Sequence, residues 1–570
     1  MNNSKSTDGT GKAGADILKM KKKMNANRKK NIRNLVITLV VAVLYYYFSL
    51  PAINIQNPSL YGYFILLLLL YCVLSINSRK LLRTTADPRE LWSAVKQNCK
   101  IPLIIAGALI VCFLLGNLVS SPLFRADSYK KLLSVSQGDF AAEVSEIRLS
   151  SQIPMLDSAS AQRLGDRKMG ELADMVSQFE VASDYTQINY GGRPVRTTPL
   201  YYGDIIKWLN NRSEGLPAYM IIDMVTQNVD VIRIRDILPG ETGIKYSTAE
   251  HFGRYLTRHL RFSFPTYMFD DANFEIDEDG VPYWVCPRIV RRIWPFGGVD
   301  IQGAVLVNAA TGECTYFEEV PTWVDRVYTA DLIIKQYDYF GRYQNGFFNS
   351  IFGQRDVTVT TDGYNYIAID DDVYMYTGIT SVNSDQSNIG FILTNQRTKE
   401  TKFYPVAGAA EYSAMDSAQG AVQHLNYVST FPLLLNISSQ PTYFMALKDS
   451  AGLVKMYAMV NVEQYQIVAT GQSVQECDAN YRNQLARNNL AETPVVGSTA
   501  EVSGEIEEIR SAVVNGNTQY YIRLAGTEHF YSISVLEAEI AVILSVGDSV
   551  VIYLTDDEGD LRLALDIVKR

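Results

Sequence analysis

The sequence predicts an α+β membrane protein with three N-terminal transmembrane helices, an ectodomain of repeated helix plus antiparallel-sheet modules, and a C-terminal small β-barrel of the OB or SH3-like kind. Three observations predict this arrangement. Three long stretches near the N-terminus are apolar and uncharged, and an eleven-residue strand–turn pattern occurs twice. The last seventy residues contain several short strands separated by turns.

The three apolar stretches are 17, 17 and 18 residues long, at the short end of what crosses a bilayer. They are Asn34 to Leu50, Leu60 to Ile76 and Ile101 to Leu118. A cleavable signal peptide does not fit the first stretch, because no small-residue cleavage site follows it and the second stretch comes almost at once. The mean hydropathy of the chain is −0.03, so the apolar excess is local.

The distribution of basic residues predicts that the N-terminus is cytoplasmic. Residues 1–33 hold ten Lys or Arg, residues 51–59 hold none, and residues 77–100 hold six. Aromatic residues at 45–48 and 61–64 fit the outer interface of the membrane. We therefore expect everything after about Ser120 to be extracytoplasmic.

The charge of the expected ectodomain limits its partners. Residues 1–120 contain 16 of the 52 basic and four of the 61 acidic residues, which leaves residues 121–570 with a net charge of −21. So acidic a domain is a poor partner for nucleic acid or anionic lipid. The basic tail is suited to anionic lipid of the inner leaflet. The expected partners are the lipid bilayer and a protein in or outside the membrane; a homo-oligomer is left open.

Composition and turn signals divide the chain into seven segments. These are a basic cytoplasmic tail (1–33), a three-span membrane region (34–120), a polar stalk with a first α+β module (121–235), a second module (236–345), a third module (346–490), a linker (491–499) and the barrel (500–570). Helical apolar spacing marks 201–210, and a further helix is expected over 472–490. A hairpin is expected over 215–232, with its turn at 226–228.

Internal repetition is the most informative feature of the expected ectodomain. Gly303 to Glu313 reads GAVLVNAATGE, and Gly390 to Glu400 reads GFILTNQRTKE. We interpret both as hairpins in which the Asn side chain bonds its own backbone. A second pattern also occurs twice. One amphipathic stretch ends at Phe264-Pro265, and another ends at Phe431-Pro432. Because proline disfavours helical backbone in the residue before it, we expect a helix to end at each.

Several of these segments resemble PepSY-type modules, which pair a helix with a small antiparallel sheet and end in a strand–D-x-x-T-G-x–strand hairpin. The segments are Gly215 to Tyr219, Asp223 with Thr226, Asp279 to Tyr283, and Val307 to Glu313. The resemblance covers about half of residues 200–470, in pieces. Asn308 stands where the family has Asp, and Lys399 where it has Gly. The resemblance implies extracytoplasmic binding or peptidase-regulating modules without catalytic residues.

The last seventy residues predict the barrel. Asn515-Gly516 between two strand-like runs is a strong hairpin signal. Further turns are expected before Val550 and at Asp556 to Asp560. An OB barrel binds nucleic acid in many proteins, but the acidic turns and the expected location favour an interaction or capping module.

Histidine and cysteine patterns do not predict a zinc site, because the sequence contains neither H-E-x-x-H nor C-x-x-C. The four histidines are His251, His259, His424 and His529. The first two lie eight residues apart on an expected helix. Neighbouring arginines at 254, 258 and 261 favour a basic, partly exposed helix over a ligand pair.

Two acidic runs are candidates for a cation. Glu275, Asp277 and Asp279 resemble the start of a calcium loop, but Cys286 stands at the twelfth position, where a bidentate carboxylate is needed. Asp370 to Asp372 is the second run. We interpret both as solvated turns.

Ser128 and Lys131 have the spacing of a Ser–Lys dyad. Charged neighbours predict a solvated lysine, which is protonated at neutral pH and a poor base. Cys286 and Cys314 are expected on neighbouring strands, and either a disulfide or two buried thiols fits them. So few cysteines favour a bacterial envelope over a eukaryotic secretory route.

The sequence contains no G-x-S-x-G or P-loop motif, and we predict no catalytic, metal or cofactor-binding residues and no cofactor. The leading hypothesis is a membrane-anchored bacterial cell-envelope protein with a non-catalytic extracytoplasmic binding, scaffolding or regulatory domain. One alternative is a subunit of a membrane complex, in which Gly107, Ala108 and Gly116 permit close helix packing. Another is an envelope peptidase or wall hydrolase built from scattered carboxylates.

Overall fold

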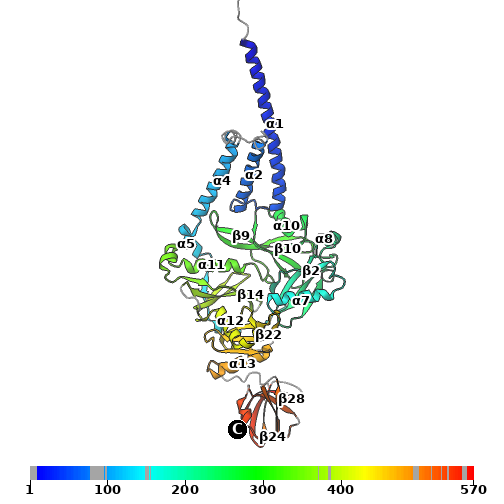
Figure 1. Cartoon of the computed structure of the whole chain (residues 1–570), viewed down its shortest axis with the longest axis vertical. Coiled ribbons are helices and arrows are strands. Elements are labelled where there is room, and N and C mark those ends of the chain that lie inside the picture. Colours follow the sequence, from blue (N-terminus) through cyan, green and yellow to red (C-terminus); the bar gives the residue numbers. More distant parts are fainter. Residues whose placement is uncertain are drawn as a thin grey trace, which may run out of the picture.

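The computed structural model describes residues 9–77, 95–96, 99–147, 153–154, 156–369, 371–382, 387–491, 500–514, 517–527, 529–535, 538–554 and 561–569. The chain is α+β, with apolar helices at one end and the C-terminal strands at the other (Figure 1). Several expected features lie outside the described residues: the basic stretch 78–94, Asp370, the linker 492–499, the Asn515-Gly516 turn and the acidic turn at 556–560.

Three helices near the N-terminus are long and apolar enough to cross a membrane, as predicted. They are α1 (Gly9–Ser49), α2 (Pro58–Asn77) and α4 (Lys100–Val119). The apolar part of α1 runs from Arg28 to Ser49. Most of their side chains are exposed, and the Asn34 amide donates to the Ser75 hydroxyl at 3.4 Å between α1 and α2. Such exposure of aliphatic side chains fits surroundings of lipid or of other helices.

The segment after α4, expected as a polar stalk, belongs instead to the globular region. It contains α5 (Pro122–Lys130), β1 (Val135–Gln137) and α6 (Phe140–Glu143). β1 extends the third sheet by pairing in parallel with residues 401–403. Leu133, Phe140 and Val144 are buried, so this segment has an apolar side that its overall polarity concealed.

Residues 158–471 contain one arrangement four times. In each repeat a helix precedes two short strands, which pair with successive halves of one long strand, and two more antiparallel strands complete the sheet.

Repeat 1 comprises α7 (Ser158–Glu171), β2 (Phe179–Val181), β3 (Thr186–Tyr190), β4 (Arg193–Tyr202), α8 (Ile205–Asn211), β5 (Ala218–Asp223), β6 (Val229–Arg233) and α9 (Ile234–Ile237). Repeat 2 comprises the 3-10 turn η2 (Phe252–Arg254), α10 (Leu256–Ser263), β7 (Met268–Phe269), β8 (Asn273–Ile276), β9 (Pro282–Ile293), β10 (Gly297–Asn308) and β11 (Cys314–Phe317).

Repeat 3 comprises α11 (Ala330–Arg342), the π-helical turn η3 (Asn349–Gly353), β12 (Thr358–Thr360), β13 (Asn365–Ile369), β14 (Asp372–Ser381), β15 (Ser387–Asn388), β16 (Gly390–Asn395), β17 (Thr401–Tyr404) and β18 (Gly408–Ala409). Repeat 4 comprises α12 (Glu411–Ala421), η4 (Gln423–Leu425), β19 (Val428–Ser429), β20 (Leu433–Ile437), β21 (Gln440–Lys448), β22 (Val454–Asn461) and β23 (Val468–Gly471), followed by α13 (Val474–Arg487).

The sequence predicted three modules where the structure has four sheets of this kind. The expected third module, 346–490, contains the strands of both repeat 3 and repeat 4. The boundary between them was missed because α12 begins two residues after β18, so no linker marks it.

In every repeat, an Asp or Asn side chain stabilises the turn of the last hairpin. This residue lies at the end of the hairpin's first strand. The Oδ1 atoms of Asp223, Asn308 and Asn395 each accept backbone N–H groups from two and three residues later, at 2.8–3.0 Å. Asn461 accepts the N–H of Gln464 at 2.7 Å. The hairpin interpretation of the eleven-residue pattern is therefore confirmed, and its turn recurs in repeats 1 and 4.

The second repeated sequence pattern is only partly confirmed. α10 ends at Ser263 with Phe264 as its C-cap, as expected. α12 ends earlier, at Ala421, and Phe431-Pro432 lies between β19 and β20. The chain leaves the helix through η4 and Asn426, which has a φ of 54°, a left-handed conformation that asparagine tolerates well.

The four sheets bury their faces in two pairs. One apolar core joins repeats 1 and 2, where the Phe274 ring packs against the rings of Tyr219 and Trp284. A second core joins repeats 3 and 4, with Tyr376 and Tyr443 fully buried in it. The helix α10 belongs to the first core and α12 to the second, whereas α11 and α13 pack on the opposite faces of the sheets of repeats 3 and 4.

The C-terminal unit has its own apolar core. Its elements are β24 (Ala500–Val514), β25 (Asn517–Leu524), β26 (Phe530–Ser534), the 3-10 turn η5 (Glu539–Ile543), β27 (Ser549–Leu554) and β28 (Leu561–Lys569). β24 pairs with β25 and β27, and β28 pairs with β26 and β27. β25 also pairs with β26, so each strand has two partners.

The Asx turns give a matched pair of stability tests. Asn308→Asp keeps the accepting oxygen and should change the free energy of unfolding by less than about 0.5 kcal/mol. Asn395→Asp should lower it by about 1–2 kcal/mol, because the Asn395 amide donates to Asp372 at 2.8 Å and the new carboxylate would face that carboxylate. Urea unfolding of the full chain in detergent measures both. Equal effects at the two positions would contradict this view of the turns.

Candidate functional site

The strongest candidate site is a cleft of about 480 Å³ where the two sheet pairs meet. Its walls come from repeats 1, 3 and 4 and from the segment that links repeats 2 and 3. The apolar and aromatic lining includes Leu156, Met224, Tyr366, Phe431 and Met445. A concave site with an apolar lining and a few polar groups is the usual form of a small-ligand site.

Two guanidinium groups line this cleft. Arg196, on β4, is only 8% exposed, and its hydrogen bonds to the Leu156 carbonyl and the Gln187 side chain are long, at 3.4 Å. Burial, reinforced by the charge of Arg326, lowers the pKa of Arg196 to about 10. Burying two like charges together is unfavourable unless an anion accompanies them.

Arg326 reaches the cleft from the segment between β11 and α11. Its Nη2 donates to the Tyr366 hydroxyl at 2.7 Å, and its guanidinium carbon lies 4.1 Å from the centre of that ring. Its buried Nε has no hydrogen-bond partner among the described residues. A buried donor without a partner costs free energy, so a ligand that accepts from it would be stabilised.

The Asp157 carboxylate, which lines the same cleft, already has partners within the protein. Asp157 caps α7 by accepting the Ser160 N–H at 2.9 Å, and it forms an ion pair with Lys448 of β21. Burial would raise the pKa of Asp157, but the hydrogen bonds from Lys448 and Ser160 outweigh burial and lower it. Asp157 therefore stays ionised and ties repeat 1 to repeat 4.

Behind Arg326 lies a buried pair of acids. Glu275, on β8, accepts the backbone N–H groups of Asp325 and Arg326 at 2.8 and 3.0 Å. Asp325 accepts the Asn189 N–H at 2.6 Å through one oxygen, while its other oxygen has no partner among the described residues. Burial raises the pKa of Glu275 to about 7. Burial and the nearby Glu275 raise the pKa of Asp325 to about 9, so Asp325 holds the proton at neutral pH.

The two histidines expected on one helix are not on one helix. His251 precedes η2 and packs edge-on against Trp208, whereas α10 begins only at Leu256. His259, on α10, lies 2.7 Å from the Gly312 carbonyl oxygen. Among the described residues, no group of three His, Cys, Asp or Glu side chains is placed to hold a metal ion.

The structure separates the members of the acidic runs. Asp277 accepts two backbone N–H groups in the turn between β8 and β9, and Glu275 faces the core instead. Asp372 is held by Arg397 at 2.6 Å and by the Asn395 amide. Asp371 is exposed, so the described part of the second run does not converge on one point.

The Ser–Lys pair is solvated. Ser128 and Lys131 are both exposed on or beside α5, and Lys131 forms an ion pair with Asp127 at 2.7 Å. Cys286 and Cys314 are free thiols on β9 and β11, with β10 between them. Strands two positions apart are about 10 Å apart, beyond the reach of a disulfide. The disulfide alternative was wrong because the two strands are not neighbours.

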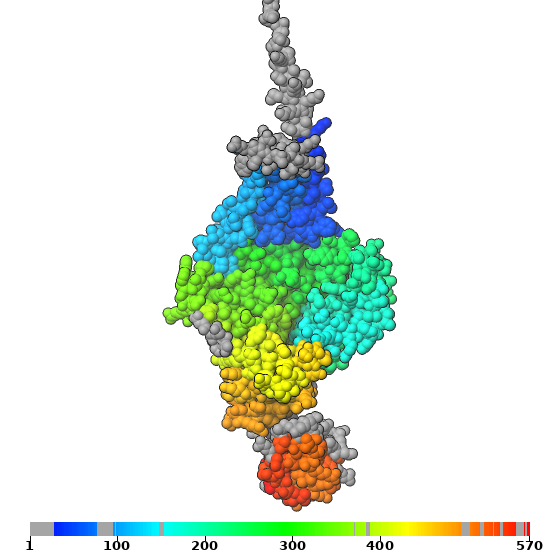
Figure 2. All heavy atoms as spheres, in the orientation of Figure 1, coloured from blue at the N-terminus to red at the C-terminus, as the bar shows by residue number. Residues whose placement is uncertain are grey.

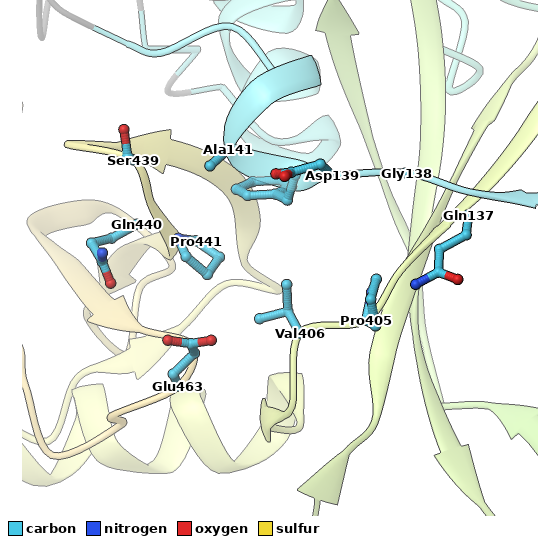
Figure 3. A pocket seen from close by; sticks show the side chains of 11 residues that line it. Gln137, Gly138, Asp139, Ala141, Pro405, Val406, Ser439, Gln440, Pro441 and Glu463 are labelled. Carbon is cyan, nitrogen blue, oxygen red and sulfur yellow. The ribbon is translucent and has the colours of Figure 1, made fainter.

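Two other hollows lack the features of the cleft. The larger, of about 620 Å³, lies between α6, the loop after β17 and the turn before β21 (Figure 3). The carboxylates of Asp139 and Glu463 point toward it, but both side chains are exposed and Asp139 caps α6. The smaller, of about 260 Å³, borders Asp223, whose oxygens are engaged by its turn and by Arg193.

Sequence reasoning missed both arginines of the cleft, which lie 130 positions apart. One signal was present. β4 is buried at every position from 195 to 200, and Arg196 is the only charged residue in that run. A charge inside a buried strand marks a site with a partner or a function.

No protein-family model matches the chain, and no curated protein matches it.

The acid pair gives a pH-dependent stability. Both carboxyl groups have a folded-state pKa above the value near 4 of an unfolded chain. The stability they contribute is complete below about pH 4 and is lost as pH rises through 7 to 9, by at most about 1.4 kcal/mol per pH unit for each proton.

Urea unfolding of the full chain between pH 6 and 9 measures this effect. Asp325→Asn mimics the protonated acid and should flatten the fall, whereas Asp356→Asn, at an acid that is 70% exposed, should leave it unchanged. A wild-type stability that rises from pH 6 to 9 would contradict the assignment.

Proposed function

We propose that this chain is a membrane-anchored bacterial cell-envelope protein whose extracytoplasmic region binds an anionic ligand in the cleft without catalysing a reaction. The carrying observation is the pair of guanidinium groups of Arg196 and Arg326 in a cleft whose lining is part polar and part apolar; the Nε of Arg326 has no partner among the described residues. The region around the cleft is strongly acidic overall, with a net charge of −21 over residues 121–570. The positive charge of the cleft attracts anions, whereas the acidic surface around it repels them, so anions are expected to bind in the cleft.

The proposed topology places the N-terminus in the cytoplasm and the repeats outside. Ten Lys or Arg before residue 34, none in the α1–α2 loop and six over residues 77–100 support it. The five C-terminal strands, each paired with two others, support a small barrel of the OB or SH3-like kind as a capping or interaction module. The repeated helix and sheet also support PepSY-like binding modules.

The ligand chemistry follows from the lining. A planar guanidinium forms paired hydrogen bonds with a carboxylate or a phosphate, and aromatic and aliphatic walls accept an apolar body. An apolar peptide with a free C-terminal carboxylate combines both features. The proposed protein partner therefore presents a chain end or an acidic apolar segment to the cleft.

Titration calorimetry on the purified full chain tests this proposal. Apolar tripeptides with a free C-terminal carboxylate should bind, and the same peptides amidated should bind at least about tenfold more weakly, since a charge-assisted hydrogen bond contributes about 1.5–3 kcal/mol. Arg326→Gln should weaken binding of the free acid to the same extent. Inorganic phosphate serves as a competitor. It should displace the peptide readily if the site recognises only the anion, and poorly if the site also binds the apolar side chains of the peptide.

Arg355→Gln is the matched control, because Arg355 is 84% exposed and lies away from the cleft. Equal binding of the acid and the amide, or equal loss on Arg355→Gln and Arg326→Gln, would contradict the anion site. Hydrolysis of the peptide, abolished by one substitution in the cleft, would replace binding by an enzymatic function.

A further inference from the structure

A short helix in repeat 1 exposes the apolar side chains that a core helix would bury. α8 is fixed by Asp204, which caps it, and by Trp208, whose ring nitrogen donates to Glu250 at 2.8 Å. Trp208 is buried, yet the three aliphatic side chains around it are 50–65% exposed. These are Ile205, Ile206 and Leu209.

α8 lies beside the end of the first apolar helix. The Arg258 guanidinium donates to the carbonyl of Tyr47, in the last turn of α1, at 3.1 Å and to that of Phe252 at 2.6 Å. The Phe252 ring lies 5.9 Å from the Trp208 ring of α8. Phe252 and α8 are therefore at the level where α1 ends.

Two further aromatic contacts place other parts of repeat 2 at the same level as the ends of the apolar helices. Phe262 of α10 packs against Tyr46 and Tyr47, with ring centres 6.4 and 6.5 Å apart. At the tip between β9 and β10, Phe296 lies 5.3 Å from the Phe113 ring of α4. Phe262 and Trp294, two residues before Phe296, remain 57% and 67% exposed.

We propose that these side chains form an apolar collar that inserts into the interface of the bilayer holding α1, α2 and α4. The apolar collar consists of Ile205, Ile206, Leu209, Phe252, Phe262 and Trp294. This inference rests on the membrane anchorage proposed above and is independent of the cleft.

The position of the collar favours lipid as its occupant. α8 lies to one side of the apolar helices, α10 under α1, and the β9–β10 tip under α2 and α4 (Figure 1). In the space-filling view the globular region directly abuts the apolar helices (Figure 2). A bilayer surrounds the helices on all sides, whereas one protein partner would cover one side. Aromatic and aliphatic side chains at a helix end are the groups that settle into the lipid interface.

The collar fixes the height and tilt of repeats 1 and 2 above the lipid. Arg261 strengthens this junction, since its buried guanidinium donates to the Leu50 carbonyl at 2.9 Å in the loop after α1. The backbone N–H of Ile53 in the same loop donates to the Pro265 carbonyl at 2.8 Å. Repeat 2 is thus held by hydrogen bonds to α1 and to the loop after it, and repeats 1 and 2 are both held by insertion into the surrounding lipid.

Tryptophan quenching by brominated phospholipid tests the collar in the full chain reconstituted into phosphatidylcholine vesicles. Trp294→Phe should remove a quenchable component from the emission. In that background Ile206→Trp should restore a component of which roughly half or more is quenched, because interfacial side chains lie within about 10 Å of the acyl chains. Val428→Trp is the matched control, since Val428 is 60% exposed and belongs to repeat 4, whose helix α12 lies farther from the apolar helices than α8 and α10 do (Figure 1).

Quenching at position 206 no greater than at 428 would overturn the collar. Flotation of the vesicles on a density gradient tests the anchorage separately. Protein that floats but shows no quenching at 206 keeps the proposed anchorage and overturns the collar, and protein that does not float overturns both.

Discussion

The arrangement of the globular region depends on one buried carboxylate. Glu275, in the core of repeat 2, accepts the two backbone N–H groups that begin the passage into repeat 3. The residues it holds then reach in opposite directions: Asp325 contacts β3 of repeat 1, and Arg326 contacts Tyr366 of repeat 3. A carboxyl group buried in this way has hydrogen-bond partners for both oxygens only while both N–H groups stay in place, so it fixes the linking segment in one conformation.

The cleft follows from that constraint. Each sheet shares one apolar face with the neighbouring sheet, which produces two pairs and leaves a junction between them. The linking segment crosses this junction and presents the Arg326 side chain to it, opposite Arg196 from β4. The two guanidinium groups of the cleft therefore come from different parts of the chain, and no single repeat contains both. Asp157 and Lys448 close the same junction on the side of repeat 4.

The sequence predicted the elements whose causes are local. Uninterrupted apolar runs predicted α1, α2 and α4, and the asparagines at 308 and 395 predicted two hairpins whose turns have the expected hydrogen bonds. It did not predict the fourth repeat as a separate module, because α12 begins two residues after β18 and no linker marks the boundary. Nor did it predict the cleft, whose arginines come together only through the packing of the sheet pairs. The exposed side of α8 was predicted as an apolar helical face, and only the structure shows that Trp208 alone turns inward.

Native-state hydrogen exchange at the N–H groups of Asp325 and Arg326 tests the central claim that the two sheet pairs form one body. If Glu275 holds the linking segment as described, these N–H groups exchange only by global unfolding, as slowly as those in the centre of β9 and β10. Exchange that is much faster there than in both sheet pairs would mean that the pairs separate in the native state, and it would contradict the claim that the cleft is a fixed site.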